Sequence, residues 1–242
     1  MTAIQINNLT KRYKDVTAVD GLSLSIEEGE LFALLGVNGA GKTTTVKMLS
    51  CLTRPDGGDA TVLGGSVTEQ PAAVKACIGV SPQETAVAAG LTVKENLELI
   101  CGIYGFSREK TEERVSELAQ TLGLEGMMSR KAGKLSGGYA RRLSIAMALV
   151  SEPRVLFLDE PTLGLDVIAR SELWDLIRAL KGRVTVILTT HYMEEAEALS
   201  DRIAIMKDGR LLVCDTPDAI KAQTEEASIE RAFIKIVREE RA

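Results

Sequence analysis

The sequence has few aromatic residues and no long apolar run. Aromatic side chains make up 4% of its 242 residues, which predicts an interior built mainly from Leu, Ile, Val and Ala. No stretch approaches the roughly eighteen consecutive apolar residues that a membrane-spanning helix needs. The N-terminal residues also lack an apolar segment behind a basic one, so we expect neither a signal peptide nor a transmembrane segment.

Cysteine pairs and an excess of positive charge are also missing. The four cysteines (Cys51, Cys77, Cys101 and Cys214) lie far apart and form no CxxC pair, which argues against a metal site and a disulfide framework. We therefore expect free thiols in a reducing compartment. The formal net charge is −5, whereas a nucleic-acid-binding protein usually carries an excess of basic residues. We therefore expect no nucleic-acid partner.

Short apolar runs alternate with segments of helical periodicity. The runs at residues 31–35, 155–158 and 184–188 are continuously apolar, as strands buried on both faces are. Alternating patterns around residues 4–6 and 22–26 predict two half-exposed strands. Buried strands separated by helices predict an α/β fold with a mainly parallel central sheet.

Three further segments have their own patterns. Residues 52–81 are rich in Gly, Pro and Asp, with β-like pieces around 60–63 and 78–80, and predict a small antiparallel subdomain. Residues 92–150 show apolar positions at helical spacing. The dipeptide Asp208-Gly209 between two strand-like runs predicts a hairpin, and Thr216-Pro217 predicts the start of a terminal helix.

A glycine-rich segment follows the first buried strand. Residues 36–43 read GVNGAGKT and fit G-x-x-x-x-G-K-[ST], with a helix expected from Lys42. Glycines allow backbone N–H groups to wrap a phosphate, and the helix N-terminus favours an anion. Lys42 would reach the β- and γ-phosphates, and the Thr43 hydroxyl would coordinate Mg²⁺. The alternative is an accidental glycine loop. The predicted phosphate-binding set is Gly36, Val37, Asn38, Gly39, Ala40, Gly41, Lys42, Thr43 and Thr44.

Two carboxylates end the second buried strand. Asp159 suits a direct or indirect role in holding Mg²⁺, and Glu160 could orient or deprotonate an attacking water. The alternative is a solvated turn at the end of the strand, since Pro161 follows.

The segment Leu135-Ser136-Gly137-Gly138 indicates the family. With the phosphate loop before it and the acidic strand after it, the sequence closely resembles the ATP-binding cassette (ABC) superfamily, whose signature is LSGG. The resemblance covers nearly the whole chain. It implies that Ser136, Gly137 and Gly138 bind the γ-phosphate of an ATP held by a second copy.

The resemblance also assigns weaker positions. Tyr13 matches the residue that stacks on adenine, and Gln83 matches the glutamine that senses the γ-phosphate through metal or water and contacts the membrane partner. Residues 164–166 match the D-loop, and His191 matches the switch histidine. Each position also has an alternative without a role in nucleotide binding or hydrolysis: Tyr13 as a packing residue, Gln83 as a solvated loop residue, and His191 as a structural histidine.

One position departs from the family pattern, because Tyr139 stands where LSGG is usually followed by glutamine. We expect activity to survive, since the Ser136 hydroxyl and the glycine amides provide most of the binding. The following Arg141-Arg142 resembles the branch that works with ABC-2-type export permeases. The alternative for both arginines is a solvated helix face that carries no information about the branch.

Together these residues imply an ATPase that powers transport. We expect residues 1–242 to form one P-loop NTPase domain whose helical subdomain, roughly 84–150, carries the signature. The implied catalytic residues are Glu160, His191 and Gln83, and the implied metal ligands are Thr43, Gln83 and Asp159. The implied cofactors are ATP and Mg²⁺. The implied partners are a second copy, in a homodimer with two ATP at its interface, and an integral membrane permease.

The permease would place the chain in the cytoplasm, on the inner face of the membrane, and the branch predicts export of a drug, antibiotic, lipid or polysaccharide. Two other readings stay open. An ABC ATPase can act without a permease, but this chain lacks the fused second cassette or long coiled coil of such proteins. A non-enzymatic nucleotide sensor would not need the full catalytic set.

Overall fold

The central feature of the fold is a six-stranded sheet. The protein is described by a computed structural model that covers residues 1–239. The strand order is β10-β9-β3-β8-β7-β6, and every neighbouring pair is parallel except β10 with β9. The mainly parallel sheet predicted from the apolar runs is therefore confirmed. Its strands are β3 (Leu31–Leu35), β6 (Ile78–Ser81), β7 (Val155–Asp159), β8 (Thr185–Thr190), β9 (Arg202–Lys207) and β10 (Arg210–Asp215).

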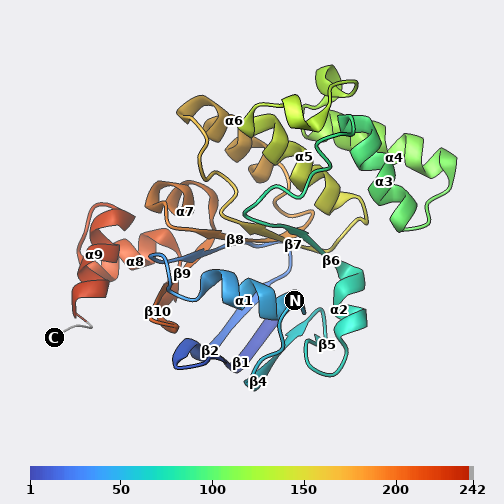
Figure 1. The fold of residues 1–242 in the computed structure, drawn as a ribbon. Coiled ribbons are helices and arrows are strands. Elements are labelled where there is room, and N and C mark those ends of the chain that lie inside the picture. The colour runs from blue at the N-terminus through green and yellow to red at the C-terminus, as the bar shows by residue number, and fades with distance from the viewer. Residues whose placement is uncertain (240–242) are drawn as a thin grey trace.

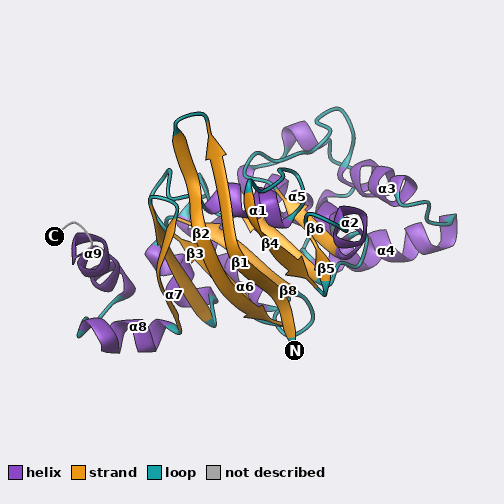
Figure 2. Cartoon of the chain, turned by 90° about the horizontal axis from the view of Figure 1, so that it is seen from below, coloured by secondary structure: helices purple, strands orange, loops and turns teal. Residues whose placement is uncertain are grey.

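A second, antiparallel sheet has the order β2-β1-β4-β5. Its strands are β1 (Thr2–Tyr13), β2 (Val16–Glu27), β4 (Gly57–Val62) and β5 (Gly65–Ser66). Most of its length comes from the two N-terminal strands, which form the long hairpin seen in Figure 2. The predicted antiparallel subdomain therefore exists, but it is not built from residues 52–81 alone.

The assignment of residues 78–80 to that subdomain was wrong. The helix α2 (Pro71–Cys77) leads into β6, which pairs in parallel with β7 at the edge of the central sheet. Local composition could not distinguish the two sheets, because the partner strand lies over seventy positions further along the chain. A backbone contact fixes β6 there: a Cβ on Gly79 would lie 2.2 Å from the carbonyl oxygen of Ala148.

The helix α1 (Lys42–Leu49) lies between the two sheets (Figure 1). Met48 and Leu49 on this helix are fully buried and pack with Phe32 and Leu34 of β3 and with apolar residues of β1 and β2. The first residues of α1 are therefore held against the end of β3. Since burial of each such side chain contributes about 1.5–3 kcal/mol, this layer fixes the loop that connects strand and helix.

The remaining helices cover the other face of the central sheet and its ends (Figure 1). The region 92–150 is largely helical, as predicted, and it contributes α3, α4, two short 3₁₀ helices and α5. Within residues 1–239 no helix combines the length and apolarity that crossing a membrane requires. The helices are α3 (Val93–Ile103), α4 (Arg108–Thr121), η1 (Glu125–Met127), η2 (Ala132–Lys134), α5 (Gly137–Leu149), α6 (Val167–Arg178), α7 (Met193–Leu199), α8 (Pro217–Thr224) and α9 (Ile229–Glu239).

Local signals set several element ends. Thr92 and Glu95 form a reciprocal capping box at the start of α3. Asp208 and Gly209 both have positive φ in the β9–β10 turn, which confirms the predicted hairpin. The Thr216 hydroxyl accepts from the Ala219 amide, so the predicted capped start of α8 is also confirmed. The helical turn that carries the signature begins at another cap, Ser136.

Candidate functional site

The phosphate loop connects β3 to α1 and requires glycine at specific positions. Gly41 has φ of 100° at the N-terminus of α1, and a Cβ there would lie 2.4 Å from the Ala18 carbonyl oxygen. At Gly36 a Cβ would lie 2.5 Å from the Met206 carbonyl oxygen. The loop backbone is therefore pressed against its neighbours, which leaves its other side to face a cavity.

Lys42 is buried in this loop, with 6% of its surface exposed. Its Nζ donates to the carbonyl oxygens of Gly36 at 2.8 Å and Val37 at 3.3 Å. It also lies 3.4 Å from Oε1 of Glu160, whose side chain is equally buried. Because a buried cation requires several such partners, the ammonium group is held at the centre of the loop.

Asp159 joins the phosphate loop to the ends of the central strands. Its Oδ1 accepts from the Thr43 hydroxyl at 3.1 Å and from the Thr189 hydroxyl at 2.5 Å. Asp159 and Thr189 are directly paired in the parallel β7–β8 ladder. The strand register therefore places this carboxylate beneath the first turn of α1.

Glu160 has a strained backbone and a defined side-chain position. Its φ is 50°, unusual for a residue with a side chain, and its amide donates to the carbonyl and hydroxyl oxygens of Thr189. Its Oε2 lies 2.7 Å from Nδ1 of His191. The ring of His191 packs on that of Tyr192, with centroids 4.1 Å apart. Glu160 is thus held at its amide by Thr189 and at its carboxylate by His191, whose ring in turn packs on Tyr192.

These groups surround a cavity of about 460 Å³. The structure brings together most of the phosphate-loop set with Gln83, Glu160 and His191, while Asp159 reaches it through Thr43. The cavity is lined by Val16, Ala18, Asn38, Gly39, Ala40, Gly41, Lys42, Thr43, Thr44, Gln83, Glu160, Leu163 and His191. Gly36 and Val37 contact Lys42 but do not line this space.

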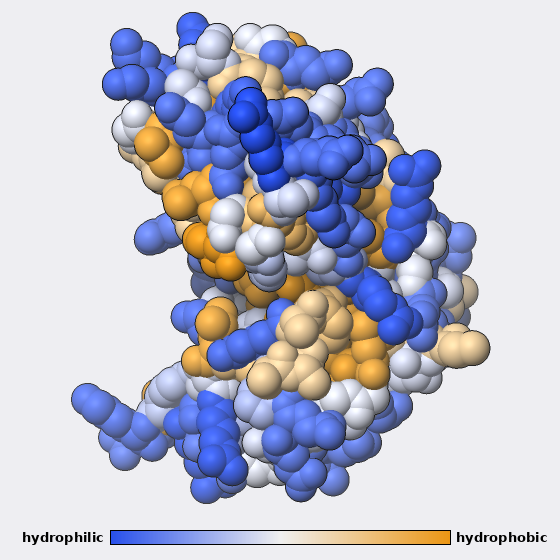
Figure 3. Space-filling model, turned by 90° about the vertical axis from the view of Figure 1, so that its right-hand side faces the viewer, coloured by the Kyte–Doolittle hydropathy of each residue, from blue (hydrophilic) through white to orange (hydrophobic). Residues whose placement is uncertain are grey.

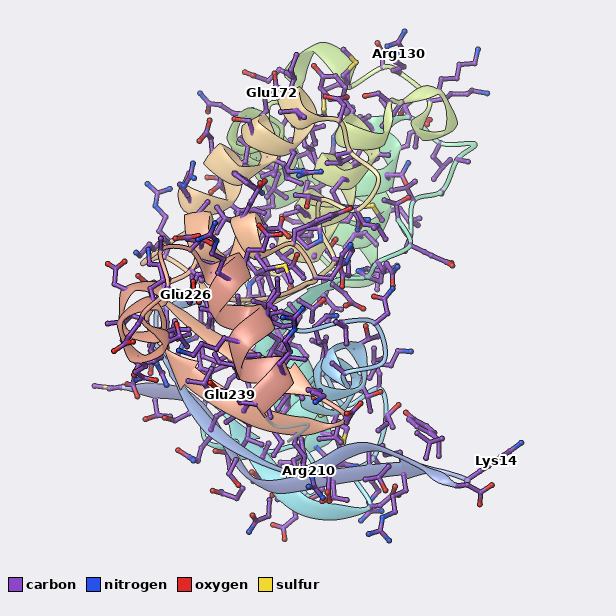
Figure 4. All side chains as sticks on the ribbon, turned by 90° about the vertical axis from the view of Figure 1, so that its left-hand side faces the viewer. Lys14, Arg130, Glu172, Arg210, Glu226 and Glu239 are labelled. Atoms are coloured by element: carbon purple, nitrogen blue, oxygen red, sulfur yellow. The ribbon has the colours of Figure 1, made fainter. Side chains whose placement is uncertain are left out.

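Tyr13 does not line the cavity. It ends β1, is 45% exposed, and has the ammonium group of Lys11 5.5 Å from its ring centroid. Its neighbour Lys14 marks the hairpin tip, which projects from the body of the molecule (Figure 4). Val16 and Ala18, on the strand that follows, are the β2 residues that line the cavity.

Ser136, Gly137 and Gly138 also lie outside this cavity. The Ser136 hydroxyl accepts from the Tyr139 amide at 3.5 Å and caps α5. Ideal Cβ atoms on Gly137 and Gly138 would approach Leu165 and Ala169. Within the described residues, therefore, the signature segment packs beside α6 of its own chain and takes no part in the site around Lys42.

Tyr139 and Arg142 form a local cluster on α5. The guanidinium carbon of Arg142 lies 5.1 Å from the ring centroid of Tyr139, and Arg142 pairs with Glu172 on α6. Glu172 is labelled on its helix in Figure 4. The alternative of a freely solvated face is wrong for Arg141, which is 5% exposed and hydrogen-bonded to the loop at Gln83.

Sequence reasoning missed three residues around the site. Thr189 donates to the Asp159 carboxylate and accepts from the Glu160 amide, and two threonines ending a buried strand could have signalled it. Arg141 donates to the carbonyl oxygens of Pro82 and Gln83. Glu195 is fully buried and accepts from Trp174 Nε1 at 3.2 Å, and burial raises the pKa of this carboxyl above its ordinary value. Nothing in the run of acidic residues around Glu195 distinguishes it.

The residues present fit a magnesium ion. A threonine hydroxyl and an aspartate carboxylate meet at 3.1 Å beside the phosphate loop, and both are the hard oxygen ligands that Mg²⁺ prefers. No three His, Cys, Asp or Glu side chains in residues 1–239 gather around one point as a metal cage. The protein therefore offers a partial ligand set, as in sites where substrate phosphates complete the coordination.

Comparisons with known proteins agree with this geometry. A family model described as ABC transporter matches residues 19–163. The daunorubicin resistance ATP-binding protein DrrA2 of Streptomyces coeruleorubidus is 45% identical over 220 residues, covering 90% of this chain and 68% of the relative. The Nod factor export ATP-binding protein I of Burkholderia orbicola (strain AU 1054) is 43% identical over 218 residues, covering 90% and 72%.

A solved structure shares the fold. The dimeric post-hydrolysis state of the ATP-binding cassette MJ0796 bound to ADP and Pi superposes with a TM-score of 0.79 at 28% identity, covering 88% of this chain and 98% of that one. The chain therefore belongs to the ABC transporter family of ATP-binding subunits. It is an ATPase with the ABC ATPase fold.

Proposed function

We propose that this chain is the motor of an export transporter and works as a head-to-tail homodimer on a separate integral membrane subunit. One observation carries the proposal. Lys42, Gln83, Glu160 and His191 share one cavity, whereas the signature segment of the same chain (residues 136–138) lies outside it. A complete site then requires the signature segment of a second copy.

In this proposal residues 1–242 form one nucleotide-binding domain, and the helical subdomain of roughly 84–150 carries the signature. The phosphate loop and Lys42 hold the β- and γ-phosphates, because they combine an ammonium group with inward-facing amides at a helix N-terminus. Tyr13 stacks on adenine beside Val16 and Ala18. Ser136, Gly137 and Gly138 of the second copy bind the γ-phosphate from the opposite side.

Mg²⁺ would be held by Thr43, Asp159 and Gln83. When bound, it neutralises negative charge on the phosphates during transfer. The contact of Thr43 and Thr189 with one oxygen of Asp159 supports this assignment, because it orients the carboxylate towards the loop.

Glu160 accepts the proton of the attacking water, while the oxygen of that water bonds to the γ-phosphorus and ADP leaves. The hydrogen bond from His191 keeps the Glu160 carboxylate in place, and Gln83 faces the same cavity. Cleavage removes the phosphate that joins the two copies, so the dimer opens after each turnover.

A groove beside the Gln83 loop suits the membrane subunit. This hollow of about 500 Å³ lies between β6, α3 and α5 and includes Pro82 in its lining. Leu52, Ile103 and Tyr104 line it and are 65%, 70% and 49% exposed. Figure 3 shows apolar side chains at the waist of this face. We propose that an apolar segment of the membrane subunit binds there, which places the chain on the cytoplasmic side of the membrane.

We infer the direction of transport from the names of the relatives. Their names describe daunorubicin resistance and Nod factor export. On that ground we propose export of a drug, antibiotic, lipid or polysaccharide through the membrane subunit.

The dimer is tested with the variant Glu160→Gln, which should bind ATP but hydrolyse it very slowly. The ATP-bound variant should therefore accumulate as a dimer, which light scattering would detect. Adding Ser136→Asn removes the serine hydroxyl but retains a residue suited to cap α5. That double variant should bind ATP as a monomer. ATP-dependent dimers of unchanged stability in the double variant would contradict the head-to-tail arrangement.

The membrane partner is tested by purifying the tagged chain from detergent-solubilised membranes. Ile103→Glu should lose the co-purifying integral membrane subunit and retain basal ATPase activity, because Ile103 is exposed and is not among the residues that line the cavity around Lys42. Ile234→Glu on α9 is the matched control. Capture of the same membrane protein by both variants would rule out the groove.

A further inference from the structure

Arg141 is a buried cation whose hydrogen bonds are made to a loop backbone. It lies in the second turn of α5 and is 5% exposed. Its Nη1 donates to the Pro82 carbonyl oxygen at 2.7 Å, and its Nη2 donates to the Gln83 carbonyl oxygen at 2.6 Å. The planar guanidinium group therefore holds two successive carbonyl oxygens through two different nitrogens in a fixed fork, whereas a lysine offers a single nitrogen on a flexible stem.

The environment of Arg141 makes it energetically unfavourable to break these two hydrogen bonds. Burial lowers the pKa of the guanidinium group, while the carboxylates of Asp159 and Glu195 favour its charged form. A buried charge that loses its hydrogen bonds is strongly destabilised. The two hydrogen bonds from Arg141 therefore persist only while the Gln83 loop keeps its position relative to α5.

Two further contacts join the same face of α5 to β6. Ser144 is one turn beyond Arg141, and its hydroxyl meets that of Ser81 at 2.9 Å in a buried position. Ala148 is a turn further, where its carbonyl oxygen leaves room only for the glycine at position 79. Spacings of three and four residues place all three contacts in one row along the helix. The Gln83 loop and α5 are thus joined as one body.

The unit formed by the Gln83 loop and α5 has one end at the cavity around Lys42 and the other end away from it. Gln83 lines the cavity around Lys42, whereas the N-terminus of α5 carries Ser136, Gly137 and Gly138 outside it. In the proposed dimer that N-terminus belongs to the other ATP site. If ATP bound in one site displaces Gln83, the signature segment that contacts the ATP of the other site should therefore move as well.

We propose that Arg141 is a positioning residue that couples the two ATP sites of the dimer, by tying the Gln83 loop to the helix that carries the signature segment. This inference rests on the proposed head-to-tail dimer. It assigns Arg141 no contact with ATP; its effect reaches the nucleotide only through the backbone of Pro82 and Gln83 and through the orientation of α5.

The test uses Arg141→Lys and Arg141→Met in the Glu160→Gln protein. We expect ATP affinity of the monomer, measured by nucleotide titration at low protein concentration, to stay within about two-fold of the parent. The dimer formed with ATP should weaken about ten-fold or more, within the range typical of coupled sites. In the hydrolysing protein, the Hill coefficient for ATP should fall towards unity.

The matched control is Arg142→Ala. Arg142 is the next residue on α5, and its partners are Glu172 and the ring of Tyr139 rather than the Gln83 loop. A structural role of α5 in general would make this variant as defective as Arg141→Lys. Equal loss of dimerisation in the two variants would overturn the proposal, as would unchanged dimerisation in Arg141→Lys.

Hydrogen exchange provides a second readout that does not need the dimer. On adding ATP to the monomer, protection should change together in segments 81–88 and 135–141 of the parent, but only in 81–88 of Arg141→Lys. If the Met variant fails to fold, Arg141→Lys and Ser144→Ala carry the same comparison. Coordinated protection that survives in both overturns the coupling. Absence of a dimer in the Glu160→Gln parent would contradict the proposed function instead.

Discussion

His191 and Glu160 are held together across the ends of neighbouring strands, with Nδ1 of the histidine 2.7 Å from Oε2 of the glutamate. Each residue directly follows a strand of the parallel β7–β8 pair, in which Asp159 is paired with Thr189. Parallel strands end at the same edge of a sheet, so the ladder itself brings the two side chains together. The contact is therefore a consequence of strand register rather than of a flexible loop.

Replacing His191 by Ala should slow hydrolysis and leave ATP binding intact. The change frees the Glu160 carboxylate to leave its position, and loss of a positioned acid–base arrangement typically costs about 100-fold or more. Phosphate release measures the first effect and nucleotide titration the second. Tyr192→Phe keeps the ring that packs on His191 and should retain turnover. Normal hydrolysis by His191→Ala would remove the histidine from the mechanism.

Replacing Lys42 by Ala should abolish measurable ATP binding. The ammonium group would form two or more charge-assisted hydrogen bonds to phosphate oxygens, each worth roughly 1.5–3 kcal/mol, so affinity should fall by about 100-fold or more. The variant should also unfold more easily, because Glu160 would be left as a buried carboxylate without its cation.

The control for Lys42 is Lys47→Ala. Lys47 lies on the same helix but is exposed, so its loss should change neither ATP affinity nor stability appreciably. Equal ATP affinity in Lys42→Ala and Lys47→Ala would contradict the assignment of the phosphate loop.

Replacing Thr189 by Val should lower kcat with little change in ATP affinity. Valine has a similar shape but removes the hydroxyl that donates to Asp159 and accepts from the Glu160 amide. A hydrogen bond to a charged group contributes about 1.5–3 kcal/mol, so we expect roughly a ten-fold loss of kcat or more. Steady-state kinetics would show this. Thr189→Ser restores the hydroxyl, and kcat equally low in both variants would indicate a packing effect.

Sequence patterns were sufficient where a function needs a continuous segment. The segment that fits the phosphate-loop pattern is recognisable because its glycines and Lys42 follow one another within residues 36–43, and the capped start of α8 depends on adjacent residues only. The apolar runs also identified β3, β7 and β8, because strands buried on both faces cannot contain polar residues without partners.

Contacts between distant segments could not be read in this way. Arg141 and Gln83 are 58 residues apart, and nothing in the helix pattern indicates that this arginine points into the protein rather than to water. The strand at 78–80 was placed in the wrong sheet because its partner, β7, follows the whole helical region. The arrangement of Ser136 away from the cavity of its own chain likewise depends on how α5 packs on α6.

The buried carboxyl of Glu195 predicts how stability changes with pH. Burial is the largest cause that raises its pKa in the folded protein, and the charge of Glu160 acts in the same direction. The hydrogen bond that Trp174 Nε1 donates to this carboxyl opposes the shift. The folded protein therefore keeps a proton that the unfolded chain releases above the ordinary pKa of 4.5. The contribution of this group to stability is full below that pKa and is lost as the pH rises through the folded value.

Replacing Glu195 by Gln should remove this dependence. Glutamine keeps an oxygen to accept from Trp174 Nε1 and carries no titratable proton, so no charge has to be buried at neutral pH. In urea unfolding between pH 5 and 8, the free energy of unfolding should decline less steeply for Glu195→Gln than for the parent. The difference in slope is limited to about 1.4 kcal/mol per pH unit for one proton. Parallel curves would show that Glu195 has the same protonation state in the folded and unfolded chains across this range.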